Sequence, residues 1–432
     1  GDTFINAGRL ELASGASLST SQLQLGDTGG TAAAELRLTS ASGGFTSDRG
    51  ITVRSGSSGT KTISATNTSG TNTLSGNVAL SSAVTPNQSS TGTLALSGVI
   101  SGAQAVTKTG TGILQLSGSN TFSGALTVQQ GTLSIATIND ASANGTLGNS
   151  ATAVTLGNTG GVTGTLSYTG ATASSSKAFA LATGGTGAFD VTTSGNTLTL
   201  SGAITGSGGL TKSGAGTLAF STQKTYTGNT TINGGILDLT GGGGSTGTIR
   251  GTATVNTGAT LRLSSGDATG YNTGSSSLTT INLAGGTLNV NTTSNQTLGG
   301  AVINMTGGSI TGITGSNLDF FQGSSAVNVL TSTSQAIISG TKINMRQNGG
   351  INFNVANGSQ DVDLLVNSVI SNSSGFTTNN LKKTGDGTMQ LTATNTFGTA
   401  VEVQAGRLLV SGYNGLLSAS GFTVSSGATL EL

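Results

Sequence analysis

Three segments of this 432-residue chain align with one another without a gap. This repetition restricts the possible folds more than any other feature of the sequence. Self-similarity of this kind is typical of solenoids, in which each repeat packs its apolar face on the next. The copies read VTKTGTGILQLSGSNTFSGALTVQQGTLSI from Val106, LTKSGAGTLAFSTQKTYTGNTTINGGILDL from Leu210 and LKKTGDGTMQLTATNTFGTAVEVQAGRLLV from Leu381. A truncated copy, FINAGRLEL, ends at Leu12.

The same residue types recur at the same slots of the three copies, which marks them as structural repeat positions. A lysine, a nearby glycine, an aromatic residue and a later glycine are shared: Lys108, Lys212 and Lys383; Gly110, Gly214 and Gly385; Phe122, Tyr226 and Phe397; Gly131, Gly235 and Gly406. A narrow solenoid interior takes columns of aliphatic side chains and few rings. We therefore expect the three aromatic side chains to be buried or stacked beside a turn, rather than to bind a ligand.

The local pattern within each copy is that of short strands. Segments such as ILQLS and TLAFS alternate apolar and small polar residues, as a strand with one buried face does. Glycine pairs separate these segments, and no segment keeps a helical apolar stripe. Short strands with glycine turns at a period of about 20 residues predict a parallel β-helix, or β-solenoid. We expect one continuous, elongated all-β rod over residues 1–432, with repeat copies ending near 12 and at about 94–135, 198–239 and 366–410.

A second set of similar segments fills the middle of the chain. INLAGGTLNV begins at Ile281, INMTGGSITGI at Ile303 and INMRQNGGINFNV at Ile343. The first interval is 303 − 281 = 22 residues and the second is 343 − 303 = 40, which is about two such steps. Asn-rich stretches such as INLAGGTLNVNTTSNQT (Ile281 to Thr297) and INFNVANG (Ile351 to Gly358) suggest ladders of stacked amides inside the coil or along turns, with sugar binding by surface Asn and Thr as the alternative.

The stretch GSGGLTKSG, Gly206 to Gly214, is one glycine short of the phosphate-binding pattern G-x-x-x-x-G-K-[ST], because Thr211 replaces the second glycine. A phosphate-binding loop needs a helix after it, whose N-terminus helps to hold the phosphate. Here the strand-like TLAFS follows, and the near-match recurs at Lys108. We interpret the stretch as a turn between two strands. Lys212 is expected on this turn, with no helix after it, either bonded to carbonyl oxygens or solvated.

Two pairs of side chains are candidates for chemistry or binding. Asp361 and Asp363 in QDVDLLV would share one face of a strand, where they could bind a cation or act as an acid/base pair. The alternative is a solvated face. Phe320 and Phe321 point to opposite faces if both lie in one strand, which would leave one ring free to contact a ligand. A bend that buries both rings is the other arrangement.

Composition excludes several classes of function. Cysteine and histidine are absent, which removes disulfides, thiolate nucleophiles, the commonest general base and the commonest transition-metal ligand. The 16 Lys and Arg against 15 Asp and Glu give no basic surface for nucleic acid. No apolar run approaches the roughly 20 residues that span a bilayer. We expect no catalysis, no cofactor, no nucleic-acid partner and no membrane span.

The pattern L-T-K-x-G-x-G-T-L-x-L, followed by N-T-[YF]-x-G and G-[TR]-L-x-[LIV], resembles the autotransporter-associated β-strand repeat, also called the passenger-associated transport repeat. The resemblance covers the three full copies and the partial copy. It implies a secreted or surface-exposed protein whose passenger is a right-handed parallel β-helix.

The repeats and this resemblance together predict a non-enzymatic extracellular or cell-surface structural protein, such as a stalk, fibre or matrix component. Both ends of the sequence read as repeat rather than cap, which suggests either a fragment or self-association, head to tail or lateral, into a filament. The alternative is an adhesin passenger that binds surface glycans or matrix. A polysaccharide-acting β-helix enzyme, which would need the two aspartates, is a third hypothesis.

Overall fold

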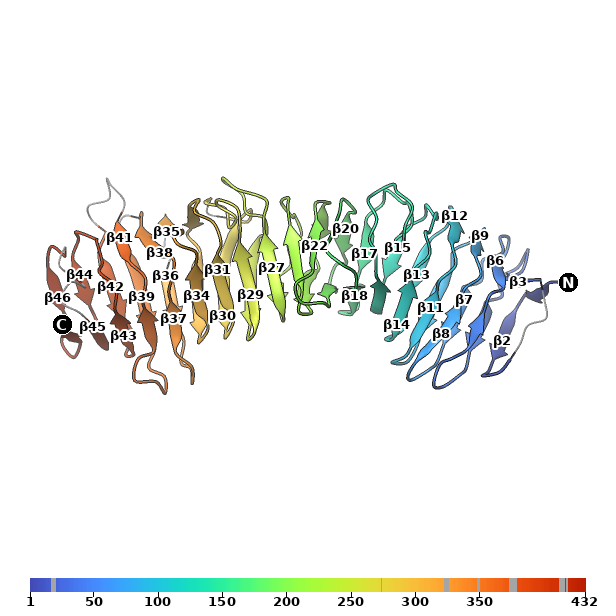
Figure 1. Cartoon of the computed structure of the whole chain (residues 1–432), viewed down its shortest axis with the longest axis horizontal. Coiled ribbons are helices and arrows are strands. Elements are labelled where there is room, and N and C mark those ends of the chain that lie inside the picture. Colours follow the sequence, from blue (N-terminus) through green and yellow to red (C-terminus); the bar gives the residue numbers. More distant parts are fainter. Residues whose placement is uncertain are drawn as a thin grey trace. The chain divides into compact units, whose positions relative to one another are not determined.

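The computed structural model describes residues 1–16, 21–272, 274–321, 326–347, 350–372, 379–411, 416 and 419–432. They form two compact units, Gly1–Gly216 and Thr217–Leu432. Among the described residues every regular element is a β-strand, and every pair of named strands is parallel. Within a unit, successive coils follow one another along the chain (Figure 1). Each unit is therefore a parallel β-solenoid, as the repeats predict.

In the first unit each strand pairs with its counterpart in the next coil, which builds five sheets. Sheet A contains β1 (Thr3–Ile5), β3 (Gln22–Leu25), β6 (Gly50–Val53), β9 (Val78–Leu80) and β12 (Ile100–Gly102); sheet B contains β2 (Gly8–Leu12), β4 (Ala34–Leu38), β7 (Lys61–Ala65) and β10 (Thr85–Gln88); sheet C contains β5 (Thr46–Ser47), β8 (Thr71–Leu74), β11 (Thr93–Leu96), β14 (Ile113–Leu116), β16 (Gly131–Ile135), β18 (Thr163–Tyr168), β21 (Thr186–Val191) and β24 (Gly209–Ser213); sheet D contains β13 (Val106–Lys108), β15 (Leu126–Val128), β17 (Val154–Leu156), β20 (Phe179–Leu181) and β23 (Ile204–Gly206); sheet E contains β19 (Ala173–Ser175) and β22 (Thr197–Leu200).

The second unit is built in the same way from three sheets. Sheet F contains β26 (Thr230–Ile232), β28 (Gly251–Asn256), β30 (Leu278–Ala284), β33 (Val302–Thr306), β36 (Ala326–Val329), β39 (Ile351–Val355), β42 (Leu381–Thr384), β44 (Val401–Val403) and β46 (Phe422–Val424); sheet G contains β25 (Thr217–Phe220), β27 (Gly235–Leu239), β29 (Ala259–Leu263), β31 (Thr287–Val290), β34 (Ser309–Gly312), β37 (Ala336–Ile338), β40 (Leu364–Val366), β43 (Thr388–Leu391), β45 (Arg407–Val410) and β47 (Thr429–Glu431); sheet H contains β32 (Gln296–Gly299), β35 (Asn317–Phe321), β38 (Lys342–Met345) and β41 (Ile370–Asn372).

Alternation along each strand places aliphatic side chains inside the coil. In β14, Leu114 and Leu116 are buried, while Gln115 between them is exposed. Leu114 pairs with Leu94 of the preceding coil and with Leu133 of the following one, so that leucines stack in a column. Burial of each leucine side chain stabilises the folded chain by about 1.5–3 kcal/mol relative to leaving it exposed. Columns of this kind stabilise the coils without large rings, which accounts for the low aromatic content of the sequence.

The pairing corrects one alignment of the middle segments. Ile281 and Ile303 are partners in sheet F, which confirms their expected equivalence. Ile343 lies in β38 of sheet H instead, where it pairs with Leu318 and Ile370. The expected equivalence of Ile343 is therefore wrong. Two different sheets carry the same I-N-M pattern, because both alternate inward aliphatic residues with outward amides.

Asparagine side chains form a ladder on the outer face of sheet F. Asn304 Nδ2 donates to Asn282 Oδ1 at 2.9 Å, and Asn328 Nδ2 donates to Asn304 Oδ1 at 2.9 Å. The ladder crosses strands, rather than lying inside the coil or along turns as expected, because aliphatic residues occupy the inward positions of β30, β33 and β36. Each amide thus joins one coil to the next.

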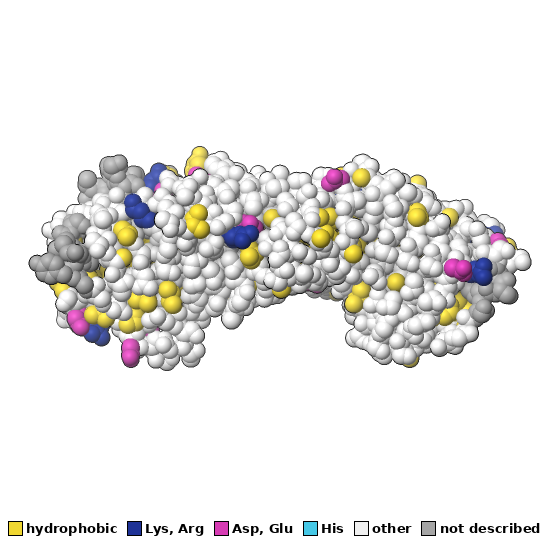
Figure 2. All heavy atoms as spheres, in the orientation of Figure 1, with side chains coloured by type: hydrophobic (Ala, Val, Ile, Leu, Met, Phe, Trp, Pro, Cys, Tyr) yellow, Lys and Arg dark blue, Asp and Glu magenta, His cyan; other side chains and the backbone are white. Residues whose placement is uncertain are grey.

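The surface of the molecule is mostly uncharged. On the face that Figure 2 shows, Lys, Arg, Asp and Glu lie in a few small groups, and neutral side chains and backbone make up most of the rest. In the part of the chain that the structure describes, no helix has the length and apolar character needed to cross a bilayer.

Candidate functional site

The structure separates the two aspartates that the sequence pairs. Asp361 is exposed, whereas Asp363 is 5% exposed and precedes β40 instead of lying in a strand. Asp363 Oδ1 accepts a hydrogen bond from Gly358 N at 2.7 Å, and its Oδ2 accepts one from Thr388 N at 2.8 Å. The expectation that both carboxylates share one strand face is therefore wrong. Asp363 is directed inward, where it accepts hydrogen bonds from two backbone amides, whereas the Asp361 side chain is exposed.

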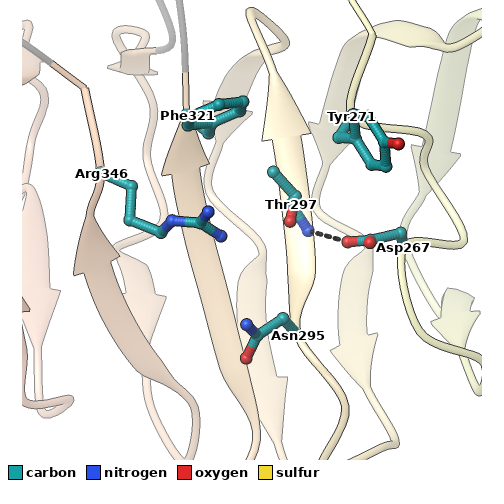
Figure 3. A pocket seen from close by; sticks show the side chains of 6 residues that line it. All are labelled: Asp267, Tyr271, Asn295, Thr297, Phe321 and Arg346. Carbon is teal, nitrogen blue, oxygen red and sulfur yellow. Dashed lines mark hydrogen bonds between the residues drawn. The ribbon is translucent and has the colours of Figure 1, made fainter. Parts of the chain in front are cut away.

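An open hollow of about 290 Å³ lies on the outer face of sheet H (Figure 3). Its lining comes from successive coils, with Thr297 in β32, Phe321 in β35 and Arg346 directly after β38. The complete lining is Asp267, Tyr271, Asn295, Thr297, Phe321 and Arg346. The hollow therefore combines two aromatic rings with a carboxylate, a guanidinium, an amide and a hydroxyl.

A network around Phe321 fixes one wall of the hollow. Phe320 is buried inside the coil and Phe321 is half-buried on the opposite face, which is the first of the two arrangements expected for this pair. The Arg346 guanidinium lies over the Phe321 ring, with Cζ 4.9 Å from the ring centroid. Arg346 Nη1 donates to Asp319 Oδ2 at 2.9 Å, and this carboxylate is fully buried and also accepts from Asn344 Nδ2 at 3.0 Å. Stacking and the ion pair together hold the guanidinium in one orientation.

Asp267 and Tyr271 form the facing wall. Asp267 has a φ of 48°, and it is one of two non-glycine residues with positive φ among the described residues. Its Oδ1 accepts a hydrogen bond from Thr297 N at 2.9 Å, drawn as a dashed line in Figure 3, and its N donates to Asn295 O at 2.9 Å. Tyr271 is 37% exposed. The strained backbone at Asp267 is held by these bonds, which direct its carboxylate along the hollow.

Each repeat copy contributes four strands to two successive coils. In the third copy β42 pairs with β44 and β43 pairs with β45. The first copy follows the same plan, with β13 paired to β15 and β14 paired to β16. A copy therefore stacks two strands on their own counterparts in the next coil. The corner between the two strands is repeated with them, and it holds the shared lysine and glycines.

The shared lysine joins the corners of two coils. Lys108 is fully buried at the end of β13. Its Nζ donates to the carbonyl oxygens of Thr109 and Gly110, both at 2.7 Å, within its own corner. It also donates to Gln130 O at 3.1 Å in the next coil. An ammonium group has three N–H donors, so these three carbonyl oxygens use all of them.

The other two copies repeat this geometry. The corresponding bonds run from Lys383 Nζ to Thr384 O (3.0 Å), Gly385 O (2.7 Å) and Ala405 O (3.1 Å), and from Lys212 Nζ to Ser213 O (2.6 Å) and Gly214 O (2.9 Å). Lys212 is buried within β24 rather than placed on the turn, so carbonyl bonding is confirmed and the solvated alternative is wrong. The next element along the chain is β25, a strand, as the turn interpretation requires.

Burial changes the acidity of these lysines. It lowers the pKa of Lys108, Lys212 and Lys383 from the ordinary 10.5 to about 8, although nearby carboxylates partly oppose the effect at Lys212 and Lys383. At neutral pH each of these three lysine side chains is therefore mostly in its charged, protonated form. The carbonyl oxygens replace part of the hydration that the ammonium loses on burial.

The shared glycines are required by both backbone conformation and space. All six have positive φ: Gly110 (74°), Gly214 (73°), Gly385 (75°), Gly131 (73°), Gly235 (59°) and Gly406 (65°). A Cβ at Gly406 would lie 2.5 Å from the carbonyl oxygens of Gly385 and Gly387. Only glycine combines the left-handed conformation with so close an approach of two backbones.

The segments that form these corners match the model of a known repeat family. The family model described as the passenger-associated-transport-repeat matches residues 106–135, 210–239 and 381–410. The chain contains three passenger-associated-transport repeats. A 115-residue stretch, 27% of the chain, is 39% identical to the Adhesin BmaC autotransporter of Brucella suis biovar 1 (strain 1330). This match spans 3% of the length of that relative. No solved structure matches the chain.

The aromatic slot of the transport repeats is buried in all three copies, as expected. Phe122, Tyr226 and Phe397 are each at most 1% exposed. Phe122 lies between β14 and β15 against Gly148, where an added Cβ would be 2.6 Å from the ring. The Tyr226 hydroxyl lies 2.5 Å from Thr230 Oγ1, and burial raises the pKa of Tyr226.

Two kinds of functional residue were not expected from the sequence. Asn120 and Asn395, two positions before the aromatic, are buried, and each side-chain Oδ1 accepts from a backbone N at 2.8 Å. The N-T-[YF] part of the repeat pattern is the signal that could have found them. The residues facing Phe321 across the hollow, Asp267 and Tyr271, carry no sequence signal, because they come from a different coil.

Proposed function

We propose that this chain is part of a non-enzymatic, extracellular surface passenger, in which the solenoid is the scaffold and its outer face makes adhesive contacts. The observation that carries this proposal is the position of the shared residues of the transport repeats. Lys108 and Lys383 are buried at coil corners and bonded to the backbone, so they serve the scaffold and leave recognition to outward side chains.

Two further observations support an adhesive rather than a purely structural role. The match to an autotransporter adhesin favours the adhesin among the roles expected from the sequence. The outer face also carries uncharged polar ladders and a hollow lined by aromatic and polar groups, which suit contact with another surface. Both carboxylate oxygens of Asp363 accept hydrogen bonds from backbone amides, which counts against the enzyme hypothesis. Stacking of copies into a filament stays a prediction.

The proposal is tested by displaying the chain on a bacterium that does not adhere by itself. Adherence is counted on epithelial monolayers and on surfaces coated with fibronectin or collagen, with the same display fusion carrying an unrelated β-solenoid as the control. We expect several-fold more adherent bacteria with this chain at equal surface density. Equal counts on every surface, or release of reducing sugar from a polysaccharide panel by the purified chain, would contradict the proposal.

A further inference from the structure

We propose that the hollow on sheet H binds a single neutral sugar ring. This inference rests on the proposed adhesive function and names the chemistry that one outward site would recognise. The side chains that such a ring would meet are those of Asp267, Tyr271, Asn295, Thr297, Phe321 and Arg346.

The hydrogen-bonding capacity of the hollow is only partly used by the protein. Asp267 Oδ1 is occupied by Thr297 N, while Asp267 Oδ2 has no partner among the described residues. Arg346 uses Nη1 for Asp319, and its Nε and Nη2 have no hydrogen-bond partner within the same described part of the chain. The hollow thus offers a free acceptor on one wall and free donors on the opposite wall (Figure 3). A ligand that matches it needs both donors and acceptors, as a ring of hydroxyl groups has.

The aromatic side chains make the site amphipathic. Tyr271 supplies an apolar wall that remains 37% exposed, and Phe321 holds the guanidinium by stacking at 4.9 Å. A pyranose ring has an apolar face of C–H groups, which carry slight positive charge and are attracted to the negative face of an aromatic ring. Its hydroxyl edge would then meet Asp267 and Arg346. One pyranose ring could therefore stack on the aromatic wall and form hydrogen bonds with the charged side chains.

Charge and size narrow the ligand further. Arg346 contributes one positive charge, whereas Asp319 and Asp267 contribute two negative charges, so the local formal charge is −1. Asp319 already neutralises the Arg346 guanidinium, and Asp267 would repel a carboxylate or sulfate group on a ligand. A neutral sugar is therefore favoured over an acidic one. The volume of about 290 Å³ lies just below the roughly 300–1,000 Å³ typical of ligand pockets, which suits one ring rather than a chain of sugars.

Titration of the purified chain tests the proposal. The probes are methyl α-D-mannoside, methyl β-D-galactoside, methyl β-D-glucoside and N-acetylglucosamine, with glucuronic acid and sialic acid as acidic comparators. Binding is measured by saturation-transfer NMR and calorimetry. At least one neutral sugar is expected to bind in the millimolar range, and more tightly than either acidic sugar. Tyr271→Ala and Asp267→Asn should each weaken that binding about tenfold, which corresponds to 1.4 kcal/mol.

Phe4→Ala is the matched control. Phe4 is also an exposed ring beside an arginine, with Arg54 Cζ 5.3 Å from its centroid, but it does not line the hollow. This variant should bind the sugar with the same affinity as the unaltered chain. Affinities are compared only among variants whose melting temperature matches that of the unaltered chain. Absence of binding to every neutral probe, stronger binding of an acidic sugar, or binding unchanged by Tyr271→Ala and Asp267→Asn would overturn the proposal. Adherence of the displayed chain without sugar binding would overturn this inference and leave the proposed function standing.

Discussion

Lys108→Met lowers the free energy of unfolding by about 3 kcal/mol. Methionine fills a similar volume without a donor, so the carbonyl oxygens of Thr109, Gly110 and Gln130 lose the bonds that Lys108 Nζ makes to them. Buried acceptors that lose a donor cost about 1–3 kcal/mol each, and removal of the lysine charge offsets part of this cost. Urea denaturation at pH 7 measures the change. Lys342→Met is the control, because Lys342 is exposed, and it should change stability by less than about 0.5 kcal/mol.

The pH dependence separates the lysine's role as a donor from its charge. Burial lowers the pKa of Lys108 to about 8, below the ordinary 10.5 that it has in the unfolded chain. Between these values the unfolded chain binds more protons than the folded chain, so the free energy of unfolding rises with pH from about 8 to 10.5. The neutral amine retains two N–H donors for the corner. Lys108→Met should reduce this rise. A stability that falls steadily from pH 8 would contradict the direction of the pKa shift.

Gly406→Ala lowers the free energy of unfolding by about 4 kcal/mol, through two separate effects. The residue has a φ of 65°, which costs an alanine about 1–2 kcal/mol. The added Cβ would also lie 2.5 Å from Gly385 O and Gly387 O, so the stacked corners of two coils would have to move apart. Overpacking of this kind costs about 1–3 kcal/mol more.

Gly258→Ala separates the two effects at Gly406. Gly258 has a φ of 78°, but nothing lies within 4 Å of the position of its Cβ. This control should therefore lose only the conformational part, about 1–2 kcal/mol. Denaturation of both variants under the same conditions gives the difference. Equal losses at the two positions would show that the close approach of the coils at Gly406 does not matter for stability.

Much of the fold could be predicted from the sequence, because inward and outward positions alternate along short strands. Leu114 and Leu116 flank Gln115 in one strand, and the structure stacks Leu114 on Leu94 and Leu133 of the neighbouring coils. What the sequence could not decide was which sheet a strand joins. Ile303 and Ile343 begin the same I-N-M pattern in sheets F and H, and the local pattern is identical for both.

The candidate site was less predictable, for two physical reasons. The sequence left Lys212 either bonded to carbonyl oxygens or solvated, and the backbone of the corner is needed to decide between the two and to show that the side chain is buried. The hollow is assembled from residues one coil apart, such as Asp267 and Thr297, which no local motif connects. Among the residues that line the hollow, only Phe321 could be expected from the sequence. It follows Phe320 directly, and adjacent residues in a strand face opposite sides of the sheet.

The in-register stacking of coils is tested most directly by cysteine pairs, since the chain has no cysteine of its own. Asn304 and Asn328 are partners in β33 and β36, with their side-chain amides joined on the outer face. Neighbouring strands about 4.8 Å apart suit a disulfide. Asn304→Cys with Asn328→Cys should therefore form a disulfide on mild oxidation, as followed by the loss of free thiols in alkylation and by the intact mass of the alkylated chain. Asn304→Cys with Asn344→Cys joins two positions that share the I-N-M pattern but lie in different sheets, and this pair should stay reduced. Cross-linking of the second pair and not the first would contradict the stacking of β33 on β36 in a parallel solenoid.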